Sequence, residues 1–244
     1  EGALSYALDN RQADFYVESM GMSAYGMLVK VHTPQGDLDI ESPLIGRFNV
    51  YNILVALAVA QTLNIPNETI VEAFANTPQI PGRMQRVSRD DEPLVLIDYA
   101  HTPDALEKAL KTISEISQGN LYCVFGCGGD RDQAKRPSMG RVVSDYADKA
   151  WITNDNPRSE DPMLIARQIE EGVKTDASNK RIPYQIVLDR RLAITEAIAE
   201  AKREDIVLIA GKGHEITQTI AGKNLTFDDA SEARKGLDVW TKPN

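Results

Sequence analysis

The chain has 244 residues, of which 42% are hydrophobic and 26% charged, and these proportions exclude a disordered, collagen-like or coiled-coil protein. Its 36 acidic residues outnumber its 27 lysines and arginines, which gives a formal net charge of −9. This balance argues against a nucleic acid or an anionic membrane surface as partner, since both require a cationic field. The longest apolar run, residues 53–60, is too short to cross a bilayer, and the chain shows no secretion leader. We therefore expect a cytoplasmic protein.

Residues 1–85 are expected to form part of a first domain. Strand patterns cover residues 13–20, 24–32 and 38–40, with a turn at Pro34-Gln35-Gly36-Asp37 before the third. The apolar segment 50–63 predicts a buried helix, because its apolar face runs nearly all round. A second helix is predicted after Pro66, with Asn67 as its cap, ending before Pro78. Pro81-Gly82-Arg83-Met84 is the predicted linker.

Residues 86–244 are expected to form a second domain, in which apolar runs alternate with amphipathic helices. The runs cover residues 94–97, 121–125, 150–152, 184–188 and 206–210. Helix-start signals follow at Thr102-Pro103, Pro137, Asp161-Pro162 and Asp189. This alternation predicts an α/β fold with a doubly wound, mostly parallel, Rossmann-like sheet. A short hairpin and a final helix are predicted after residue 216.

Four polar loops follow the predicted strands, at residues 98–101, 126–131, 155–158 and 211–215. Because ligands bind beyond the carboxyl ends of the strands in open parallel sheets, we expect these loops to gather at one edge. The two glycine-rich loops lack the spacing of a dinucleotide fingerprint or a phosphate loop. The basic run Arg131, Lys135, Arg136 and Arg141 fits a solvated helix entry about as well as a phosphate site.

The charged residues of these loops suit a zwitterionic ligand. Arg131 and Arg158 could each bind a carboxylate through a bidentate fork, and Asn156 could donate its amide to the same group. Glu215 could accept an ammonium group, helped by the carbonyl of Gly211. The alternatives are a salt bridge from Arg158 to Glu160 or Asp161 and a solvated Glu215.

The two cysteines and three histidines give no sign of a disulfide framework or a metal site. Cys123 is predicted to be a small buried residue and Cys127 a loop residue, both reduced. His32, His101 and His214 have no metal-ligand spacing, so no metal site is expected in these residues.

Six segments in this order resemble the Mur ligases, and most closely the members that add meso-2,6-diaminopimelate. They are Gly46-Arg47-Phe48-Asn49-Val50-Tyr51-Asn52, Pro81-Gly82-Arg83-Met84, Asp98-Tyr99-Ala100-His101-Thr102-Pro103-Asp104, and the segments 126–131, 155–158 and 211–215. The similarity extends over nearly the whole chain from about residue 44.

The resemblance implies an ATP-dependent ligase that joins meso-diaminopimelate to UDP-N-acetylmuramoyl-L-alanyl-D-glutamate, through an acyl phosphate, in peptidoglycan precursor synthesis. Residues 1–85 would be the C-terminal part of the central, ATPase-type domain, and residues 86–244 the amino-acid-binding domain. Asn49, Asn52, Arg83 and Asp98 would bind ATP. By the same resemblance, the residues that bind meso-diaminopimelate would be Arg131, Asp155, Asn156, Pro157, Arg158, Gly211 and Glu215. Arg158 is the informative residue, because lysine-adding relatives lack it.

The family's phosphate loop, its magnesium ligands and its UDP-binding domain are absent from these residues. We therefore expect a C-terminal portion of a longer enzyme, unable to ligate alone, whose full length uses ATP and Mg²⁺. The alternatives are another ligase of the superfamily, similar to cyanophycin or folylpolyglutamate synthetases, and an amino-acid-binding module without catalysis.

Overall fold

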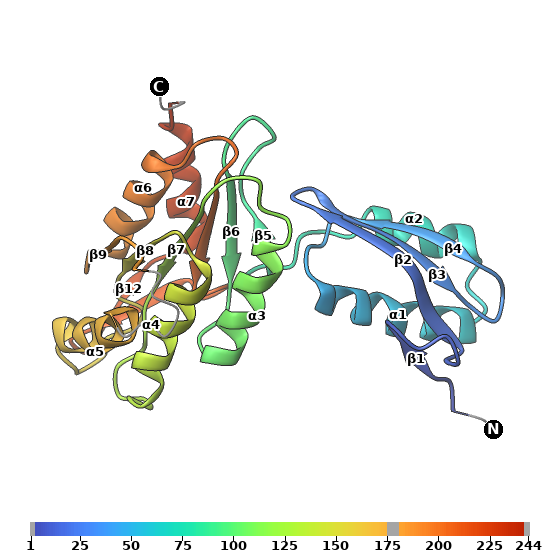
Figure 1. Ribbon diagram of the computed structural model, residues 1–244, viewed down its shortest axis with the longest axis horizontal. Helices are drawn as coiled ribbons and strands as arrows, with labels where there is room; N and C mark the ends of the chain where they lie inside the picture. The colour runs from blue at the N-terminus through green and yellow to red at the C-terminus, as the bar shows by residue number, and fades with distance from the viewer. Residues whose placement is uncertain (1–2, 175–180, 242–244) are drawn as a thin grey trace. The chain divides into compact units, whose positions relative to one another are not determined.

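The structure is a computed structural model that describes residues 3–174 and 181–241. The chain divides into two compact units, residues 1–79 and residues 80–244. Each unit has its own sheet (Figure 1).

The first unit is a four-stranded sheet with two helices. Strands β1 (Tyr6–Ala7), β2 (Phe15–Ser23), β3 (Gly26–His32) and β4 (Leu38–Ser42) lie in sequence order, with β1 parallel to β2 and the other pairs antiparallel. Helices α1 (Arg47–Thr62) and α2 (Asn67–Ala75) complete the unit. Its core joins Val29 and Val31 of the sheet to Leu54 and Leu57 of α1. The three predicted strands and two predicted helices are confirmed.

Two details of the predicted helices are wrong. Helix α1 is buried on one face only, because the unit's core contacts just that face, while Phe48, Tyr51 and Val59 stay exposed. Asn67 is the first residue of α2 rather than its cap. The cap position belongs to Pro66, which offers no side-chain acceptor, and Asn67 Oδ1 instead accepts a hydrogen bond from Gln61 Nε2 at 2.9 Å.

The second unit is built on a six-stranded sheet with the order β5-β6-β10-β7-β8-β9. The strands are β5 (Gln85–Arg86), β6 (Leu94–Asp98), β7 (Leu121–Phe125), β8 (Lys149–Ile152), β9 (Tyr184–Ile186) and β10 (Ile206–Ala210). All neighbours are parallel except β5 and β6. The predicted α/β class and mostly parallel sheet are confirmed, and β10 lies between β6 and β7 although it follows them in the chain.

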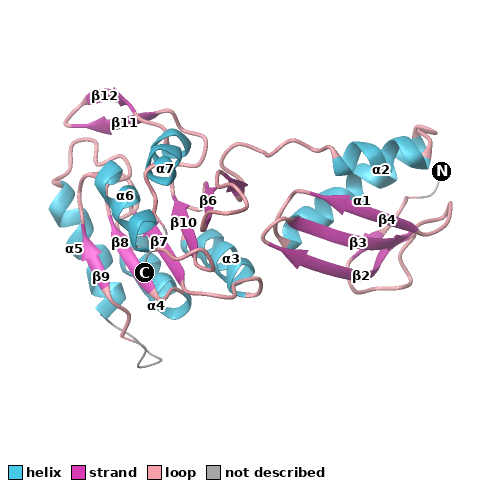
Figure 2. Cartoon of the chain, turned by 90° about the horizontal axis from the view of Figure 1, so that it is seen from above, coloured by secondary structure: helices cyan, strands magenta, loops and turns pink. Residues whose placement is uncertain are grey.

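Helices cover both faces of this sheet (Figures 1 and 2). Helices α3 (Pro103–Ser114), α4 (Lys135–Tyr146) and α5 (Pro162–Lys174) pack in succession, and α6 (Arg190–Glu200) packs with α7 (Asp229–Asp238). Trp151 and Val207 of the sheet lie in one core with Ile194 and Ala197 of α6 and Leu237 of α7. The hairpin of β11 (Thr217–Ile220) and β12 (Lys223–Thr226) lies at the edge of the unit shown at the top of Figure 2.

Side-chain caps fix where several helices begin. Thr102 Oγ1 accepts a hydrogen bond from the N–H of Ala105, and Pro103 occupies the first turn of α3. Asp189 caps α6 in the same way through the N–H groups of Arg191 and Leu192. Both caps were predicted from the sequence, and both follow directly on the loops that leave a strand. Helix α4 differs, because it begins at Lys135 rather than at Pro137.

The segment 80–85, which the sequence grouped with the first domain, belongs to the second unit. The N–H of Tyr99 donates to the carbonyl of Gly82 at 2.8 Å, and β5 pairs with β6. A Cβ on Gly82 would lie 2.3 Å from the nitrogen of His214, so only glycine fits at this approach.

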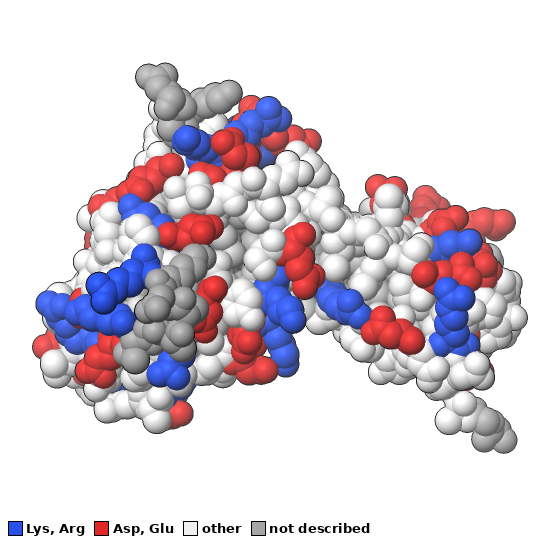
Figure 3. Space-filling view, in the orientation of Figure 1, with Lys and Arg blue, Asp and Glu red and all other residues white. Residues whose placement is uncertain are grey.

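Charges of both signs are interspersed over the face shown in Figure 3. Recognition of an anion on this face therefore depends on a local arrangement of side chains rather than on a broad cationic surface. Among residues 3–174 and 181–241, no helix combines the length and the apolarity that a bilayer span needs.

Candidate functional site

A cavity of about 510 Å³ lies at the carboxyl edge of the six-stranded sheet. Loops that follow β6, β7, β8 and β10 supply its walls, so the predicted convergence of these four loops is confirmed. Its lining includes Arg131, Asp155, Asn156, Arg158, Gly211 and Glu215, six of the seven residues predicted for the amino acid. The lining is balanced in formal charge, because Arg131, Lys135 and Arg158 match Asp132, Asp155 and Glu215.

Arg158 is held in an unusual backbone conformation at this cavity. Its φ is +53°, in the left-handed region, which residues other than glycine, asparagine and aspartate rarely adopt. The N–H of Arg158 donates to the carbonyl of Thr219 at 3.0 Å, and Nη1 donates to the carbonyl of Gly129 at 2.7 Å. Neither Glu160 nor Asp161 pairs with it within the described residues. Nη2 and Nε have no partner in that part of the chain, so the fork is available to a ligand carboxylate.

Asn156 and Glu215 form one hydrogen-bonded unit on the cavity wall. The Asn156 amide donates from Nδ2 to Glu215 Oε2 at 2.9 Å and to Asp155 Oδ1 at 3.0 Å. Burial acts to raise the pKa of Glu215, but the hydrogen bonds from Asn156 and Lys212 outweigh it and hold the pKa below its usual value. Glu215 is therefore an anion with two protein donors, although its side chain remains 34% exposed. Asn156 spends both amide hydrogens on carboxylates, so its predicted donation to the ligand would require one of these bonds to break.

Asp155, Pro157 and Gly211 shape the loop around this unit. Asp155 is 7% exposed, and burial raises the pKa of its carboxyl, an effect that nearby Arg190 and Lys212 oppose. Gly211 has a φ of +115°, and a Cβ there would lie 3.1 Å from Asp155 Oδ2. Pro157 is buried outside the lining, and its carbonyl lies 2.0 Å from where a Cβ on Gly129 would be. Pro157 thus acts on the loop packing rather than on the cavity surface.

Lys212 was not among the predicted site residues, yet it lies fully buried against the lining residues Asn156 and Glu215. Its Nζ donates to Thr217 O at 2.6 Å, Glu215 Oε2 at 3.0 Å and Asn156 Oδ1 at 3.3 Å. Tyr99 and His101, both in the predicted loop 98–101, also line the cavity. Thr102 and Lys135 line it as well, although neither was predicted to bind the amino acid.

The basic run at the start of α4 is not a solvated helix entry throughout, and a phosphate site there stays a prediction. Arg136 is fully buried and makes a bidentate ion pair with Glu160 at 2.9 Å, while Nη2 also donates to the carbonyl of Gly128. Lys135 Nζ donates to the carbonyl of His101 at 2.7 Å. Only Arg131 and Lys135 of this run line the cavity.

Asn49 and Asn52, predicted for ATP, share a face of α1. Asn52 Nδ2 donates to Asn49 Oδ1 at 3.1 Å, and the buried Asn49 donates to the carbonyl of Ile45 at 2.8 Å. The exposed Asn52 keeps its amide oxygen free within the described part of the chain. This oxygen can accept a hydrogen bond from a ligand.

Arg83 and Asp98, the other two predicted ATP residues, belong to the second unit. The exposed Arg83 guanidinium lies over the ring of Tyr99, 5.4 Å from its centroid. Asp98 accepts hydrogen bonds from the N–H groups of Met84 at 2.8 Å and Ala100 at 2.9 Å. Burial raises the pKa of Asp98, and these two hydrogen bonds oppose that rise. Asp98 therefore organises the strand end, and within the described residues each of its side-chain oxygens accepts one hydrogen bond, which leaves one lone pair on each.

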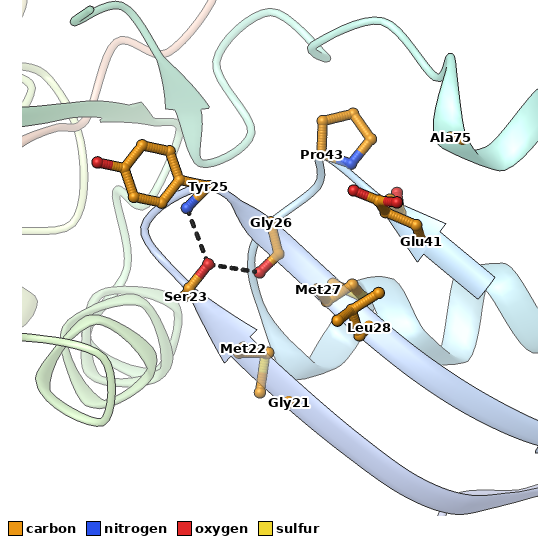
Figure 4. A pocket seen from close by; sticks show the side chains of 11 residues that line it. Gly21, Met22, Ser23, Tyr25, Gly26, Met27, Leu28, Glu41, Pro43 and Ala75 are labelled. Atoms are coloured by element: carbon orange, nitrogen blue, oxygen red, sulfur yellow. Dashed lines mark hydrogen bonds between the residues drawn. The ribbon is translucent and has the colours of Figure 1, made fainter. Parts of the chain in front are cut away.

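A second hollow of about 410 Å³ lies at the β2–β3 hairpin in the first unit (Figure 4). Met22, Met27 and Leu28 give it apolar walls, and none of the predicted site residues lines it. The Ser23 hydroxyl is already bonded to the N–H of Tyr25 and the carbonyl of Gly26. Tyr25, Glu41 and Ser42 also line the hollow, so its walls are partly apolar and partly polar.

The cysteines and one histidine were also assessed as reactive or metal-binding groups. Cys123 and Cys127 are buried free thiols, as predicted for Cys123, and burial raises the pKa of Cys127 to about 12. Glu18 of β2, His32 of β3 and Asp37, just before β4, place three possible ligand atoms within 4.8 Å of one another. Lys30 Nζ already lies 3.2 Å from Glu18, and a cation beside a cation is unfavourable.

Comparison with known proteins identifies the family. A family model described as "Mur ligase, glutamate ligase domain" matches residues 82–213, and one described as "Mur ligase middle domain" matches residues 1–60. The chain belongs to the Mur ligase family.

Two Mur ligases that resemble most of this chain share a name. A UDP-N-acetylmuramoyl-L-alanyl-D-glutamate–2,6-diaminopimelate ligase of Coxiella burnetii is 46% identical over 94% of this chain and 46% of its own length. A solved ligase of that name is 42% identical, with a TM-score of 0.73, over 96% of this chain and 47% of its own. A folylpolyglutamate synthase of Mycobacterium tuberculosis, 22% identical with a TM-score of 0.63 over 81% of this chain and 45% of its own, shares the fold. This chain spans about half the length of the curated relatives it matches.

Proposed function

We propose that this chain holds the amino-acid site of an ATP-dependent amide-bond ligase that adds meso-diaminopimelate to UDP-N-acetylmuramoyl-L-alanyl-D-glutamate. One observation carries the proposal: the guanidinium fork of Arg158, open to a ligand, and the anionic Glu215 line the same cavity. Diaminopimelate presents a carboxylate and an ammonium on the same distal carbon, and these two groups match the two side chains. Related ligases that carry this name support the choice of substrate.

In the proposed complex, Arg158 and Arg131 bind the distal carboxylate, and Glu215 with the carbonyl of Gly211 binds the distal ammonium. Lysine has the ammonium but not this carboxylate, so it would leave the arginines unpaired. Each hydrogen bond to a charged group contributes about 1.5–3 kcal/mol, so losing two of them weakens binding by roughly two to four orders of magnitude. The cavity thereby orients the other end of the amino acid, whose amine forms the new bond.

We assign the nucleotide to Asn49, Asn52, Arg83 and Asp98. The residues fit in part: the Asn52 oxygen, the Arg83 guanidinium and the remaining lone pairs of Asp98 can each contact a polar ligand group. The nucleotide would supply the phosphoryl group that activates the substrate carboxylate, with Mg²⁺ as its counter-ion. Arg83 would neutralise phosphate charge, and Asp98 would accept from ribose hydroxyls. A reaction that uses ATP and a UDP-linked precursor takes place in the cytoplasm.

Isothermal titration calorimetry tests the amino-acid site. The chain is titrated with meso-diaminopimelate and with L-lysine, and both titrations are repeated with Arg158→Ala. The matched control is Arg141→Ala, which removes an exposed arginine of α4 that lies outside the cavity lining. We expect binding of meso-diaminopimelate, at least a hundredfold weaker binding of lysine, and loss of that difference in Arg158→Ala only.

Three results of these titrations would contradict the proposal. Equal binding of lysine and meso-diaminopimelate by the wild-type chain contradicts the role given to Arg158. Failure of both amino acids to bind overturns the assignment of an amino-acid site to this chain. Retained selectivity in Arg158→Ala would move the carboxylate contact to Arg131, against the proposal.

A further inference from the structure

Lys212 is a fully buried lysine in a protein loop that already contacts the candidate site. Its side chain has 0% exposure, and all three ammonium hydrogens have acceptors: Thr217 O, Glu215 Oε2 and Asn156 Oδ1. Burial of a lysine is unfavourable unless its charge is paired and its donors are satisfied, and both conditions are met here. The three hydrogen bonds and the ion pair with Glu215 therefore explain how a lysine can be buried at this position.

The backbone around Lys212 explains why its side chain can turn inward. Gly211 and Gly213 have φ values of +115° and +54°, in the region that favours glycine. The N–H of Glu215 donates to the carbonyl of Lys212 at 3.0 Å and closes a turn. This turn places the acid at the cavity and the base beneath it, three residues apart.

The acceptors of Lys212 leave a definite set of atoms for a ligand. Glu215 Oε2 accepts from both Lys212 Nζ and Asn156 Nδ2, whereas Oε1 has no hydrogen bond within residues 3–174 and 181–241. Asn156 Oδ1 accepts from Lys212 and from the N–H of Thr219 at 2.9 Å, which fixes how the amide is turned. One carboxylate oxygen of Glu215 is thus fully occupied, and the other is left for the cavity.

We propose that Lys212 is a positioning residue for the amino-acid ligand: by holding Glu215 Oε2 and Asn156 Oδ1 it presents Glu215 Oε1 to the ligand's distal ammonium. This inference rests on the proposed function, in that the ligand is an amino acid with such an ammonium. Lys212 itself does not touch the ligand. Its effect is specificity, because it favours amino acids that place an ammonium beside the carboxylate bound by Arg158.

The choice of ligands separates positioning from plain structural support. L-2-Aminopimelate has both carboxylates of diaminopimelate but lacks the distal ammonium, so it makes no bond to Glu215. Lys212→Met should weaken binding of meso-diaminopimelate at least tenfold and change binding of L-2-aminopimelate less than threefold, as measured by calorimetry. In a Glu215→Gln background, the same substitution should have no further effect on meso-diaminopimelate. Equal weakening of both ligands would show that Lys212 only supports the fold, and would overturn the proposal.

A ligand-free measurement keeps this proposal separate from the proposed function. The carboxyl carbon of Glu215 is titrated by NMR in the wild-type chain and in Lys212→Met, and we expect its pKa to rise in the variant because a hydrogen bond and a positive charge are lost. An unchanged pKa overturns the Lys212–Glu215 coupling even if the amino acid binds. A raised pKa without any binding of meso-diaminopimelate contradicts the proposed function alone.

Two further variants provide a control for Lys212→Met and a replacement for it. Lys149→Met removes another lysine of the same unit, paired with Glu200 and away from the cavity lining, and should leave both affinities unchanged. Where Lys212→Met does not fold, as judged by its amide NMR spectrum, Lys212→Gln retains a donor beneath the loop. The same two measurements, with the same expected directions, then apply to it.

Discussion

The buried ion pair between Arg190 and Asp229 gives the sharpest stability prediction. Arg190 Nε lies 2.7 Å from Asp229 Oδ1 and Nη2 lies 2.8 Å from Oδ2, and both side chains have 0% exposure. Nη2 also donates to the carbonyl of Ala210 at 3.0 Å, and Nη1 to that of Asn154 at 3.3 Å. Arg190 thus joins the starts of α6 and α7 to the carboxyl ends of β10 and β8.

Arg190→Met should destabilise the second unit strongly, because methionine replaces the volume but none of the donors. The substitution leaves the Asp229 carboxylate buried without a counter-ion, which typically costs about 3–5 kcal/mol. The carbonyl of Ala210 also loses its side-chain donor. The neighbouring Arg191 provides a matched control, since it also pairs with an acid of α7, Glu232 at 2.8 Å, but its side chain is 59% exposed. Arg191→Met should therefore cost less than about 1 kcal/mol.

Urea denaturation followed by tryptophan fluorescence measures this difference in the right unit. The chain has two tryptophans, Trp151 and Trp240, and both belong to the second unit, where they contact its core. The fluorescence transition therefore reports the unfolding of residues 80–244, whatever the first unit does. The double variant Arg190→Met with Asp229→Leu should recover most of the lost stability, because no uncompensated charge remains. Equal losses for Arg190→Met and Arg191→Met would refute the reasoning, since burial would then have no effect on the strength of the pair.

Three further outcomes are expected. Hydrogen bonds from its neighbours lower the pKa of Glu170 from 4.5 to about 2, although burial opposes this shift. The stability that Glu170 contributes is therefore present above pH 4.5 and is lost as the pH falls through about 2. Glu170→Gln should flatten the dependence of the free energy of unfolding on pH between these two values. Gly129→Ala places a Cβ 2.0 Å from the carbonyl oxygen of Pro157 and should weaken amino-acid binding at least tenfold in calorimetry, whereas Gly21→Ala, with no atom within 4 Å, should leave it unchanged. Neither cysteine should react with iodoacetamide at pH 8 until urea unfolds the protein, because both thiols are buried and the pKa of Cys127 is about 12; labelling of the folded chain detected by mass spectrometry would contradict this.

The strand and helix alternation of the second unit could be predicted because its signals are local. Apolar runs of four to five residues between capped helices specify parallel strands, and the loops that leave such strands share one edge by geometry. Asp98, Asp155 and Gly211 could therefore be placed at that edge without knowledge of strand order. The order itself, with β10 between β6 and β7, depends on contacts between residues far apart in the chain.

The exposed face of α1 is a feature that the sequence did not predict. An apolar residue in a helix predicts burial only on average, since about half of a protein's surface is apolar. Val55 and Val59 are 39% and 54% exposed although the helix pattern surrounds them with apolar neighbours. Which face of a helix is buried depends on the elements that pack against it, and the sequence of the helix alone does not specify those elements.

Buried cations are the part of the candidate site that the sequence could not predict. A basic residue in a polar loop or at a helix start is expected in solvent, yet Lys212 in a loop, Arg136 at the start of α4 and Arg190 at the start of α6 are all fully buried. Arg136 joins Gly128 to Glu160, Arg190 bonds to the carbonyls of Asn154 and Ala210, and Lys212 joins Asn156 to Glu215.

These three cations have a common physical cause. The carboxyl edge of a parallel sheet gathers strand-end carbonyl groups and the acids that follow them, and the irregular loops there lack a ladder of backbone hydrogen bonds. A buried cation with several donors satisfies those oxygens and fixes two loops relative to each other, a gain in specificity rather than in net stability. Side chains outside the cavity lining thus help to fix its shape, and substitutions at these three positions should alter ligand selectivity as well as the free energy of unfolding.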